Sequence, residues 1–462
     1  MHIILKKLLK LIVFSAIFNC TFAFVNIGVN AAPIELSNIN LVILFNNDSI
    51  DNDVKDIIIN SGGTIINEYP ELGGIEVCCS KDLIPKIKAR NSVNSLAPNH
   101  IIKLSDNEIE NKNNLFNNLN ITNQWDIDKV TNNGKSFNLE SGNHSVVVGI
   151  IDSGVDIDHP DLINNFLGGE NLVPNNFNDN DSETGNLLDI NDRIGHGTEI
   201  AGIIAANGNI KGVAPNIAFK SYRVFDEYGD STATILSSAI VKATNDHVNV
   251  INLSMEGYDL KGKCYWIDPE TKIKYDLGNN TAEYALLKRA VQYALKHNVT
   301  VVAAAGNKAL DCSNKKNLTN YLNNLYGDQG FKYEGITYEV PGSIDGVITV
   351  SATTKNNTLA SYSNYGKDFI DIAAPGGDIS DIDEENNLCL TTTIDDDYTY
   401  TLGTSIAAPK VSAVAALIIC KHKGISPKIV ERKICRSADS LGVASTKEYY
   451  GSGLVNAYNA LQ

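Results

Sequence analysis

The chain of 462 residues is long enough for two or three domains and one large hydrophobic core. With 43% hydrophobic and 20% charged residues, its composition is that of a soluble globular protein. Acidic residues outnumber basic ones by 54 to 38, a formal net charge of -16. This charge argues against nucleic acid as a partner and is compatible with a cationic substrate, although acidity also serves solubility alone.

Residues 1–23 have the pattern of a secretory signal peptide. A basic start is followed by an apolar stretch to Phe18, and residues 21–23 offer a cleavage site, with an alternative end near residue 32. No later run reaches the roughly 20 apolar residues that cross a bilayer, and the chain ends without a hydrophobic or basic tail. We therefore expect a secreted, extracellular protein that is a monomer and has no membrane anchor.

Residues 36–103 predict a small α+β domain. Strand patterns lie at 40–45, 64–69, 74–78 and 93–96, and helical patterns at 51–60 and 80–88. This β-α-β-β-α-β order is typical of a ferredoxin-like domain and says nothing about function by itself. Residues 104–122, rich in Asn and charge, have the composition of an exposed, easily cut linker.

From residue 123 to 462, short strands alternate with helices. Strand patterns lie at 146–151, 217–224, 248–253, 299–304 and 347–350, and helical patterns at 197–206, 235–245, 283–297 and 409–422. Near-continuous apolar strands between helices predict an α/β fold of three layers with a mostly parallel sheet. Reactive groups in such sheets gather at the carboxyl ends of the strands.

Three polar residues occupy positions where this rule places an active site. Asp152 directly follows the strand at 146–151, His196 begins a helix between two glycines, and Ser405 is expected to begin another helix. Each residue alone is more often structural, as a turn cap, a surface or core histidine, or a helix N-cap. Together they supply the nucleophile, base and carboxylate of acyl transfer, in the chain order Asp, His, Ser.

The segments around these residues resemble the subtilisin-like serine peptidases. They read IIDSGVDIDHPDL, GHGTEIAGIIAA and GTSIAAPKVSAVAAL, and further similar stretches extend the resemblance over nearly everything from Gln124 onward. The resemblance implies a subtilisin-like fold, with Ser405 as nucleophile, His196 as general base and then acid, and Asp152 as the group that orients the imidazole.

The same resemblance implies an oxyanion donor and a role for the first domain. Asn307, in the segment Ala-Ala-Ala-Gly-Asn, matches the residue whose amide meets the oxyanion beside the Ser405 backbone N–H. The plainer alternative is that Asn307 is a turn residue after Gly306. Residues 36–103 match the propeptide that assists folding and blocks the cleft, and release is expected within 104–122.

Within the family, the lantibiotic leader peptidases are the most similar branch. The segments at 124–136, 205–216 and 222–231 carry this resemblance. Those enzymes remove leader peptides from modified antimicrobial precursors, commonly after Pro-Arg. Two alternatives are a broad-specificity extracellular protease and a peptide-binding relative without activity, and the intact catalytic set argues against the second.

The substrate pocket departs from the family pattern. Ser254, Met255 and Glu256 replace the usual Ser-Leu-Gly, and a carboxylate at the Gly position would favour Arg or Lys before the cleaved bond. A cation or water would then have to reach this buried charge, unless Glu256 points to solvent at the rim. Ala233 stands where relatives often have an aromatic residue, which predicts a roomier site further from the cut.

No cofactor or metal site is expected to be required for the chemistry. The loop at 207–211, where many relatives bind calcium, is too short to wrap an ion that takes six or more oxygens. Acidic stretches at 179–183 and 395–397 could hold calcium weakly, but we expect them to be solvated loops that attract a cationic substrate. Among the eight cysteines, a Cys264–Cys312 disulfide is conceivable, whereas buried free thiols are expected at Cys420 and Cys435.

Overall fold

The computed structural model describes residues 38–47, 49–104, 123–279, 281–379, 387–442 and 446–462. The predicted signal peptide and all but the first residue of the predicted linker lie outside these residues.

The N-terminal residues form a four-stranded antiparallel sheet with the strand order β2-β3-β1-β4. Its elements are β1 (Asn38–Phe45), α2 (Asn52–Asn60), β2 (Thr64–Tyr69), β3 (Gly74–Ser80), α3 (Ile84–Lys88) and β4 (Val93–Pro98). Asp51 caps α2 by accepting a hydrogen bond from the Asp53 amide. Pro85 lies in the first turn of α3, where its missing N–H breaks no hydrogen bond within the helix. The predicted ferredoxin-like order is confirmed.

The central sheet contains seven parallel strands, in the order β16-β15-β13-β10-β6-β8-β7. They are β6 (Val147–Asp152), β7 (Phe166–Asn171), β8 (Ala218–Arg223), β10 (Val250–Leu253), β13 (Thr300–Ala304), β15 (Val347–Thr353) and β16 (Ile372–Pro375). Successive side chains point to opposite faces, so Ile150 joins the core under α6 (His196–Ala205) and α11 (Thr404–Lys421). Ile151 joins the core under α7 (Ala233–Asn245) and α8 (Ala282–Lys296). The predicted three-layer α/β fold is confirmed.

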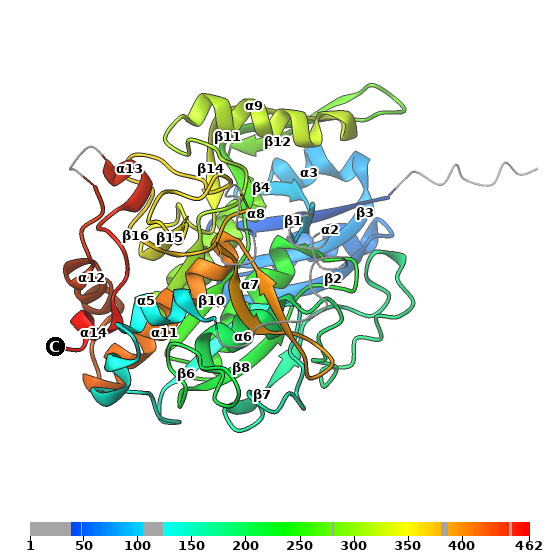
Figure 1. Ribbon diagram of the computed structural model, residues 1–462. Coiled ribbons are helices and arrows are strands. Elements are labelled where there is room, and N and C mark those ends of the chain that lie inside the picture. Colours follow the sequence, from blue (N-terminus) through cyan, green and yellow to red (C-terminus); the bar gives the residue numbers. More distant parts are fainter. Residues whose placement is uncertain (1–37, 48, 105–122, 280, 380–386, 443–445) are drawn as a thin grey trace, which may run out of the picture. The chain divides into compact units, whose positions relative to one another are not determined.

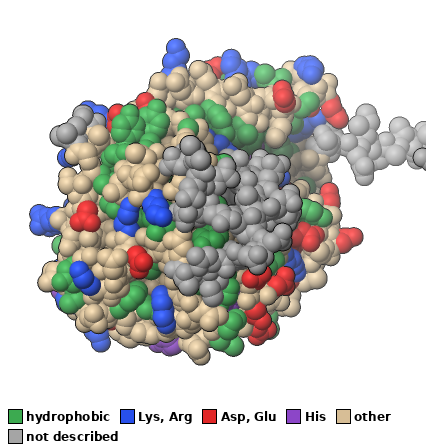
Figure 2. All heavy atoms as spheres, viewed as in Figure 1, with side chains coloured by type: hydrophobic (Ala, Val, Ile, Leu, Met, Phe, Trp, Pro, Cys, Tyr) green, Lys and Arg blue, Asp and Glu red, His purple; other side chains and the backbone are tan. Residues whose placement is uncertain are grey.

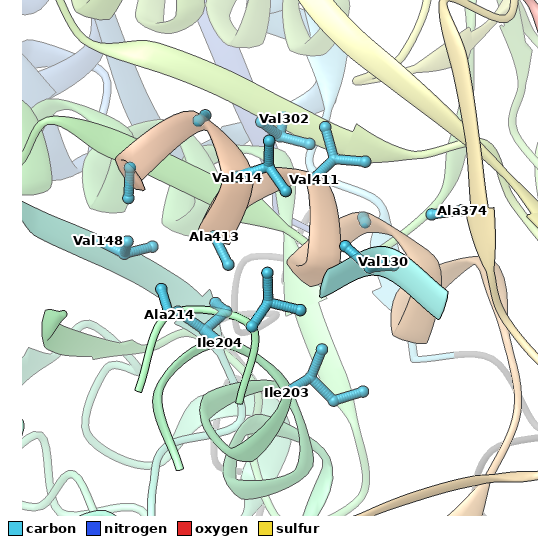
Figure 3. Close-up of a cluster of buried hydrophobic side chains, with 14 of the residues drawn as sticks. Val130, Val148, Ile203, Ile204, Ala214, Val302, Ala374, Val411, Ala413 and Val414 are labelled. Atoms are coloured by element: carbon cyan, nitrogen blue, oxygen red, sulfur yellow. The ribbon is translucent and has the colours of Figure 1, made fainter. Parts of the chain in front are cut away.

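Helix α11 is the interior helix of the first of these cores. Val411, Ala413 and Val414 project among side chains from α6 and from the central strands (Figure 3). The helix is long and apolar enough to cross a bilayer, but 89% of its most apolar window is buried inside the protein. The sequence pattern at 409–422 covers only part of this helix, but the expectation that Ser405 lies at a helix N-terminus is confirmed. The helix begins at Thr404, so Pro409 lies inside it.

The protein contains a second antiparallel sheet that the sequence patterns did not predict. Its strands are β11 (Gly257–Ile267), β12 (Lys274–Asn279) and β14 (Phe331–Val340), and α9 (Lys315–Tyr326) packs against β14. We call these four elements the accessory sheet. It lies next to the N-terminal sheet, with β12 contacting β4 and α3 (Figure 1).

Strand β1 shows how the N-terminal sheet packs on the rest of the chain. Leu41, Ile43 and Phe45 face a core that includes Leu260 and Tyr275 of the accessory sheet. The alternate side chains, Val42 and Leu44, face the core under α7 and α8. Both faces of this strand are therefore buried, and one of the two cores is shared with the accessory sheet.

All seven described cysteines are free thiols. Cys264 lies in the core shared with the N-terminal sheet, and Cys312 packs in a separate cluster with Leu318 and Phe369. The disulfide considered between them is thus not formed. Cys420 is buried and Cys435 half-buried, both as free thiols.

Charged side chains of both signs are dispersed over the face of the molecule in Figure 2. Among the described residues of that face, the Lys and Arg side chains do not merge into a continuous basic surface of the kind that binds nucleic acid.

Candidate active site

Asp152 and His196 form a buried carboxylate–imidazole pair. Asp152 ends β6 and His196 begins α6, and Oδ1 of the first lies 2.7 Å from Nδ1 of the second. The two side chains are 0% and 1% exposed. Gly197 permits the close approach of α6, because a Cβ there would lie 2.1 Å from the Gly154 carbonyl oxygen. The carboxylate is thereby placed to fix the ring's orientation and to favour its protonated form.

Ser405 is the second residue of α11, and its carbonyl group has an unusual partner. Pro409, four residues on, has no N–H to complete the helical hydrogen bond to this carbonyl. The Ser254 hydroxyl, just after β10, donates to it instead at 2.8 Å. Asn252 links the same hydroxyl to Ser412 further along α11, through two hydrogen bonds of 2.8 Å. The end of β10 is thus joined to the first turns of α11.

Asn307 follows β13 and contacts the helix start that carries Ser405. Its Oδ1 accepts hydrogen bonds from the Thr404 amide at 2.9 Å and from the Thr404 hydroxyl at 2.7 Å. These bonds fix the side-chain amide with Nδ2 as its donor end. This amide is in the right chemical state to donate a hydrogen bond to an oxyanion.

A small pocket joins the remaining predicted residues to Ser405. It is lined by Leu104, Ser254, Met255, Glu256, Ala304, Gly306, Asn307, Thr404 and Ser405. Residues 101–104 of the chain itself reach this pocket. β5 (Ile101–Lys103) pairs antiparallel with β9 (Asp230–Thr232), and the Leu104 amide donates to the Gly229 carbonyl at 2.8 Å. An extended peptide therefore lies along β9 and ends beside the pocket.

Glu256 lines this pocket and is held by the protein's own donors. Its Oε2 accepts hydrogen bonds from the backbone N–H of Asn307 at 2.9 Å and from the Tyr258 hydroxyl at 3.1 Å. The Glu256 side chain is 9% exposed. Lys308 Nζ lies 3.7 Å from Oε1. Sequence reasoning expected a cation or water to compensate this charge and missed these donors, which come from residues on other elements. Gly306 is required here, because at φ 99° a Cβ would lie 2.2 Å from Oε2.

The acidic stretch at 179–183 is not a fully solvated loop, which corrects the expectation. Glu183 is buried and accepts two hydrogen bonds from the Arg223 guanidinium, whose side chain is 1% exposed. Burial raises the pKa of Glu183, but Arg223 and Arg193 outweigh it and hold this pKa below its ordinary value. The pair lies beside β6, because Arg223 is the register partner of Asp152.

The loop at 207–211 presents donors where a calcium site needs oxygens. The amides of Asn209 and Ile210 both donate to the Asp161 carboxylate at 2.9 Å. Within the described ranges, no three His, Cys, Asp or Glu side chains gather in a way that could hold a metal ion.

Comparison with known proteins places this geometry in a family. Residues 143–453 match the model of the subtilase family. Epidermin leader peptide-processing serine protease EpiP of Staphylococcus epidermidis is 32% identical over 421 residues, which cover 86% of this chain and 87% of EpiP. Nisin leader peptide-processing serine protease NisP of Lactococcus lactis subsp. lactis is 37% identical over 325 residues, which cover 67% of this chain but only 45% of NisP.

Solved structures agree with these matches. The crystal structure of EpiP from Staphylococcus aureus has a TM-score of 0.76 at 30% identity and covers 92% of this chain and 98% of its own. The structure of the nisin leader peptidase NisP from Lactococcus lactis has a TM-score of 0.64 at 33% identity, covering 73% and 93%. The family model spans well over half of the sequence, and the chain belongs to the subtilase family of serine endopeptidases.

Proposed function

We propose that this subtilase removes the leader peptide from a lantibiotic-type precursor by cleaving after a basic residue, Arg. The observation that carries the proposal is the buried Asp152–His196 pair together with a pocket that holds Ser405 and Asn307. The relatives named above support the substrate class, because two of them are leader peptide-processing proteases and EpiP aligns with most of this chain.

In the proposed reaction, Ser405 Oγ attacks the carbonyl carbon of the cleaved bond while His196 accepts its proton. Asp152 stabilises the imidazolium, and Asn307 Nδ2 with the Ser405 N–H binds the oxyanion of the tetrahedral intermediate. The C–N bond then breaks, and His196 donates the proton to the leaving amine. Water attacks the acyl-enzyme by the same steps, which releases the carboxylate product and restores Ser405. No cofactor enters this cycle.

We infer that residues 36–103 act as an inhibitory and folding-assisting propeptide that is released by a cut within 104–122. The pairing of β5 with β9, and the position of Leu104 in the Ser405 pocket, support this role, because a strand added to a sheet edge is a common way to bind an extended peptide. The pattern of residues 1–23 supports secretion.

The preference for Arg rests on Glu256 as a buried carboxylate of the pocket. Replacing Glu256 with Gln is expected to weaken cleavage of peptides with Arg before the bond by about 1–3 kcal/mol in the free energy of the transition state. Matched peptides with Leu at that position serve as the control. Equal losses in kcat/KM for the Arg and Leu peptides would show that Glu256 does not determine the preference for Arg.

The function is tested by digesting a lantibiotic-type precursor in buffer containing EDTA and identifying the products by mass spectrometry. We expect one cut at the leader junction, after Arg, with slow or no digestion of unfolded casein. Broad casein digestion with many cuts in the precursor would favour the general extracellular protease instead. Loss of turnover in EDTA that calcium restores would contradict the cofactor-free proposal.

A further inference from the structure

His100 connects the N-terminal sheet to the strand in the cleft, and it is almost completely buried. It lies between β4 and β5 and is 8% exposed. Its amide donates to Glu283 Oε1 at 2.7 Å, and its ring Nδ1 lies 2.8 Å from Glu283 Oε2. Glu283 is in the first turn of α8, so both of its oxygens are engaged by one residue of the bound segment.

Aromatic side chains of the accessory sheet surround the imidazole. The ring centroids of Tyr326 and Phe331 lie 4.4 and 4.6 Å from that of His100. The Tyr333 hydroxyl is 3.2 Å from Nε2, the other ring nitrogen. The imidazole thus contacts the Tyr326 ring at an interplanar angle of 36° and the Phe331 ring at 74°, and both of its nitrogens are in contact with polar groups. We call Glu283, Tyr326, Phe331 and Tyr333 the aromatic cage.

A second carboxyl group lies beside the cage. Asp259 lies nearby, and burial together with the Glu283 charge raises its pKa well above the ordinary value. The Thr281 hydroxyl donates a hydrogen bond to Asp259. Two carboxyl groups in a largely apolar surrounding cost free energy unless a donor or cation reaches them. When the His100 segment leaves the cleft, Glu283 loses the two contacts that His100 provides.

The cage belongs to the peptide-binding cleft. A cavity of about 380 Å³ runs from His100 past Ala233 and Tyr258 to Glu256 and Lys308. The predicted absence of an aromatic wall at Ala233 therefore coincides with a large cavity beside the bound strand. Any peptide that pairs with β9 in the register of β5 presents a backbone N–H at the position of the His100 amide.

We propose that the aromatic cage is a substrate subsite that accepts a planar cationic side chain, Arg or His, from the leader peptide. The cage surrounds His100, which is four residues before Leu104 in the bound segment. Leu104 lies in the Ser405 pocket and its amide reaches Gly229, so a substrate bound in this register is cleaved after the residue that takes the position of Leu104 or after the following one. The subsite thus takes the fifth or sixth residue before the bond. A guanidinium or imidazolium pairs with Glu283 and, being flat, packs against the rings as His100 does, which an ammonium does less well. This inference rests on the proposed function.

The test uses enzyme obtained by expressing the full chain and a set of fluorogenic peptides with one fixed sequence around the bond. Every peptide carries Arg next to the bond, and a second Arg is moved through the second to the eighth residue before the bond, the other positions being Ala. Beyond the residue next to the bond, we expect kcat/KM to rise about tenfold at the fifth or sixth position. At that position Arg and His should exceed Leu, Phe and Lys. A preference for Phe or Leu would show an apolar pocket and overturn the proposal.

Glu283→Gln is expected to reduce the Arg-to-Ala ratio of kcat/KM at this position to about one. Glu334→Gln is the matched control, since Glu334 is an exposed carboxylate on β14 of the same sheet, and it should keep the wild-type ratio. A Glu283→Gln enzyme that retains the ratio overturns the inference. The peptide scan on the wild type decides the matter if this variant does not fold.

The peptide with Ala at every position except the Arg next to the bond separates the proposed peptidase function from the proposed subsite. If it is cleaved by the wild type and not by Ser405→Ala, the peptidase assignment stands, and a flat Arg scan contradicts only the cage. If neither enzyme cleaves any peptide of the set, the proposed function fails and the subsite fails with it.

Discussion

Pro409 and Ser254 together define the backbone beneath the proposed nucleophile. A proline inside a helix leaves one carbonyl without its amide partner, here that of Ser405. The Ser254 hydroxyl donates to this carbonyl, so the first turn of α11 is fixed from the neighbouring strand end rather than by the helix itself. This hydrogen bond therefore ties the pocket wall directly to the backbone of Ser405.

At the same scale, Asn307 is expected to contribute only when charge develops on the substrate. Replacing Asn307 with Ala should lower kcat about 100- to 1000-fold with little change in KM, a magnitude taken from removal of such a donor in subtilisin. Kinetics under saturating peptide measure both constants.

Asn307→Asp is the companion variant, because Asp retains the oxygen that accepts from the Thr404 amide but removes the Nδ2 donor. It should lose kcat like the Ala variant. If it keeps kcat within about threefold of the wild type, Asn307 holds the helix start and does not stabilise the oxyanion.

The motifs predicted which residues approach the site, but not the contacts that hold them. Asp152 and His196 are recognisable because each follows or begins an element at the carboxyl edge of the sheet. The hydrogen bond from the Asn307 backbone N–H to Glu256 was not predictable, because it depends on a turn at Gly306 and on a residue 51 positions earlier, between β10 and β11.

At the scale of elements, helix α11 carries a buried ion pair within its apolar surface. Lys410 Nζ lies 2.8 Å from Asp126 Oδ2 of α5 (Trp125–Thr131), and neither side chain is exposed. The ammonium also donates to the Ile406 carbonyl at 3.1 Å. Removing one partner leaves a buried charge without compensation, which is costlier than removing both.

Lys410→Met is therefore expected to lower the free energy of unfolding by about 3–5 kcal/mol, as measured by chemical denaturation. The double variant with Asp126→Asn should recover much of this loss. Lys332→Met, which breaks an exposed pair with Glu334, is the control and should cost about 0–1 kcal/mol. Similar losses for the two single variants would contradict a structural role for the buried pair.

The strand pairing of the accessory sheet could not be predicted from local sequence patterns. β14 carries buried Phe331, Tyr333, Thr337 and Glu339 at alternating positions, a strand signal that is visible in the sequence once the strand is known. Its partner β11 lies more than 60 residues earlier, and no local pattern gives that pairing. The parallel strands of the central sheet were predictable because their apolar runs are continuous and separated by helices.

At the scale of the whole molecule, the N-terminal sheet is built into the protein through the accessory sheet. The two share one hydrophobic core, and Lys81 forms a nearly buried ion pair of 2.5 Å with Asp268 across their boundary. The sequence predicted the order of the strands and helices along the N-terminal domain from local patterns. It could not predict this boundary, which depends on surfaces that are distant along the chain.

Buried carboxyl groups at this boundary and near the pocket predict how stability depends on pH. Burial, and then the charge of Glu256, raise the pKa of Glu339 well above its ordinary value of 4.5. A raised folded-state pKa stabilises the protein below the unfolded pKa, and this contribution is lost as the pH rises through the folded-state pKa. The free energy of unfolding should therefore decline as the pH increases above about 5.

Glu339→Gln should flatten this decline, by up to about 1.4 kcal/mol per pH unit over the interval where Glu339 titrates. Asp259, whose pKa is also raised, remains in the variant and preserves part of the slope. Chemical denaturation at several pH values measures both curves. Parallel curves for wild type and Glu339→Gln would mean that Glu339 does not take up a proton on folding.

The catalytic assignment of Asp152, His196 and Ser405 is tested most directly by covalent labelling with a fluorophosphonate that reacts only with an activated serine. Wild-type protein should gain one adduct, located on Ser405 by mass spectrometry of its peptides. Ser405→Ala should gain none, and His196→Ala should react at least about 100-fold more slowly because no base activates the hydroxyl. Labelling of another serine, or undiminished labelling of His196→Ala, would contradict the assignment.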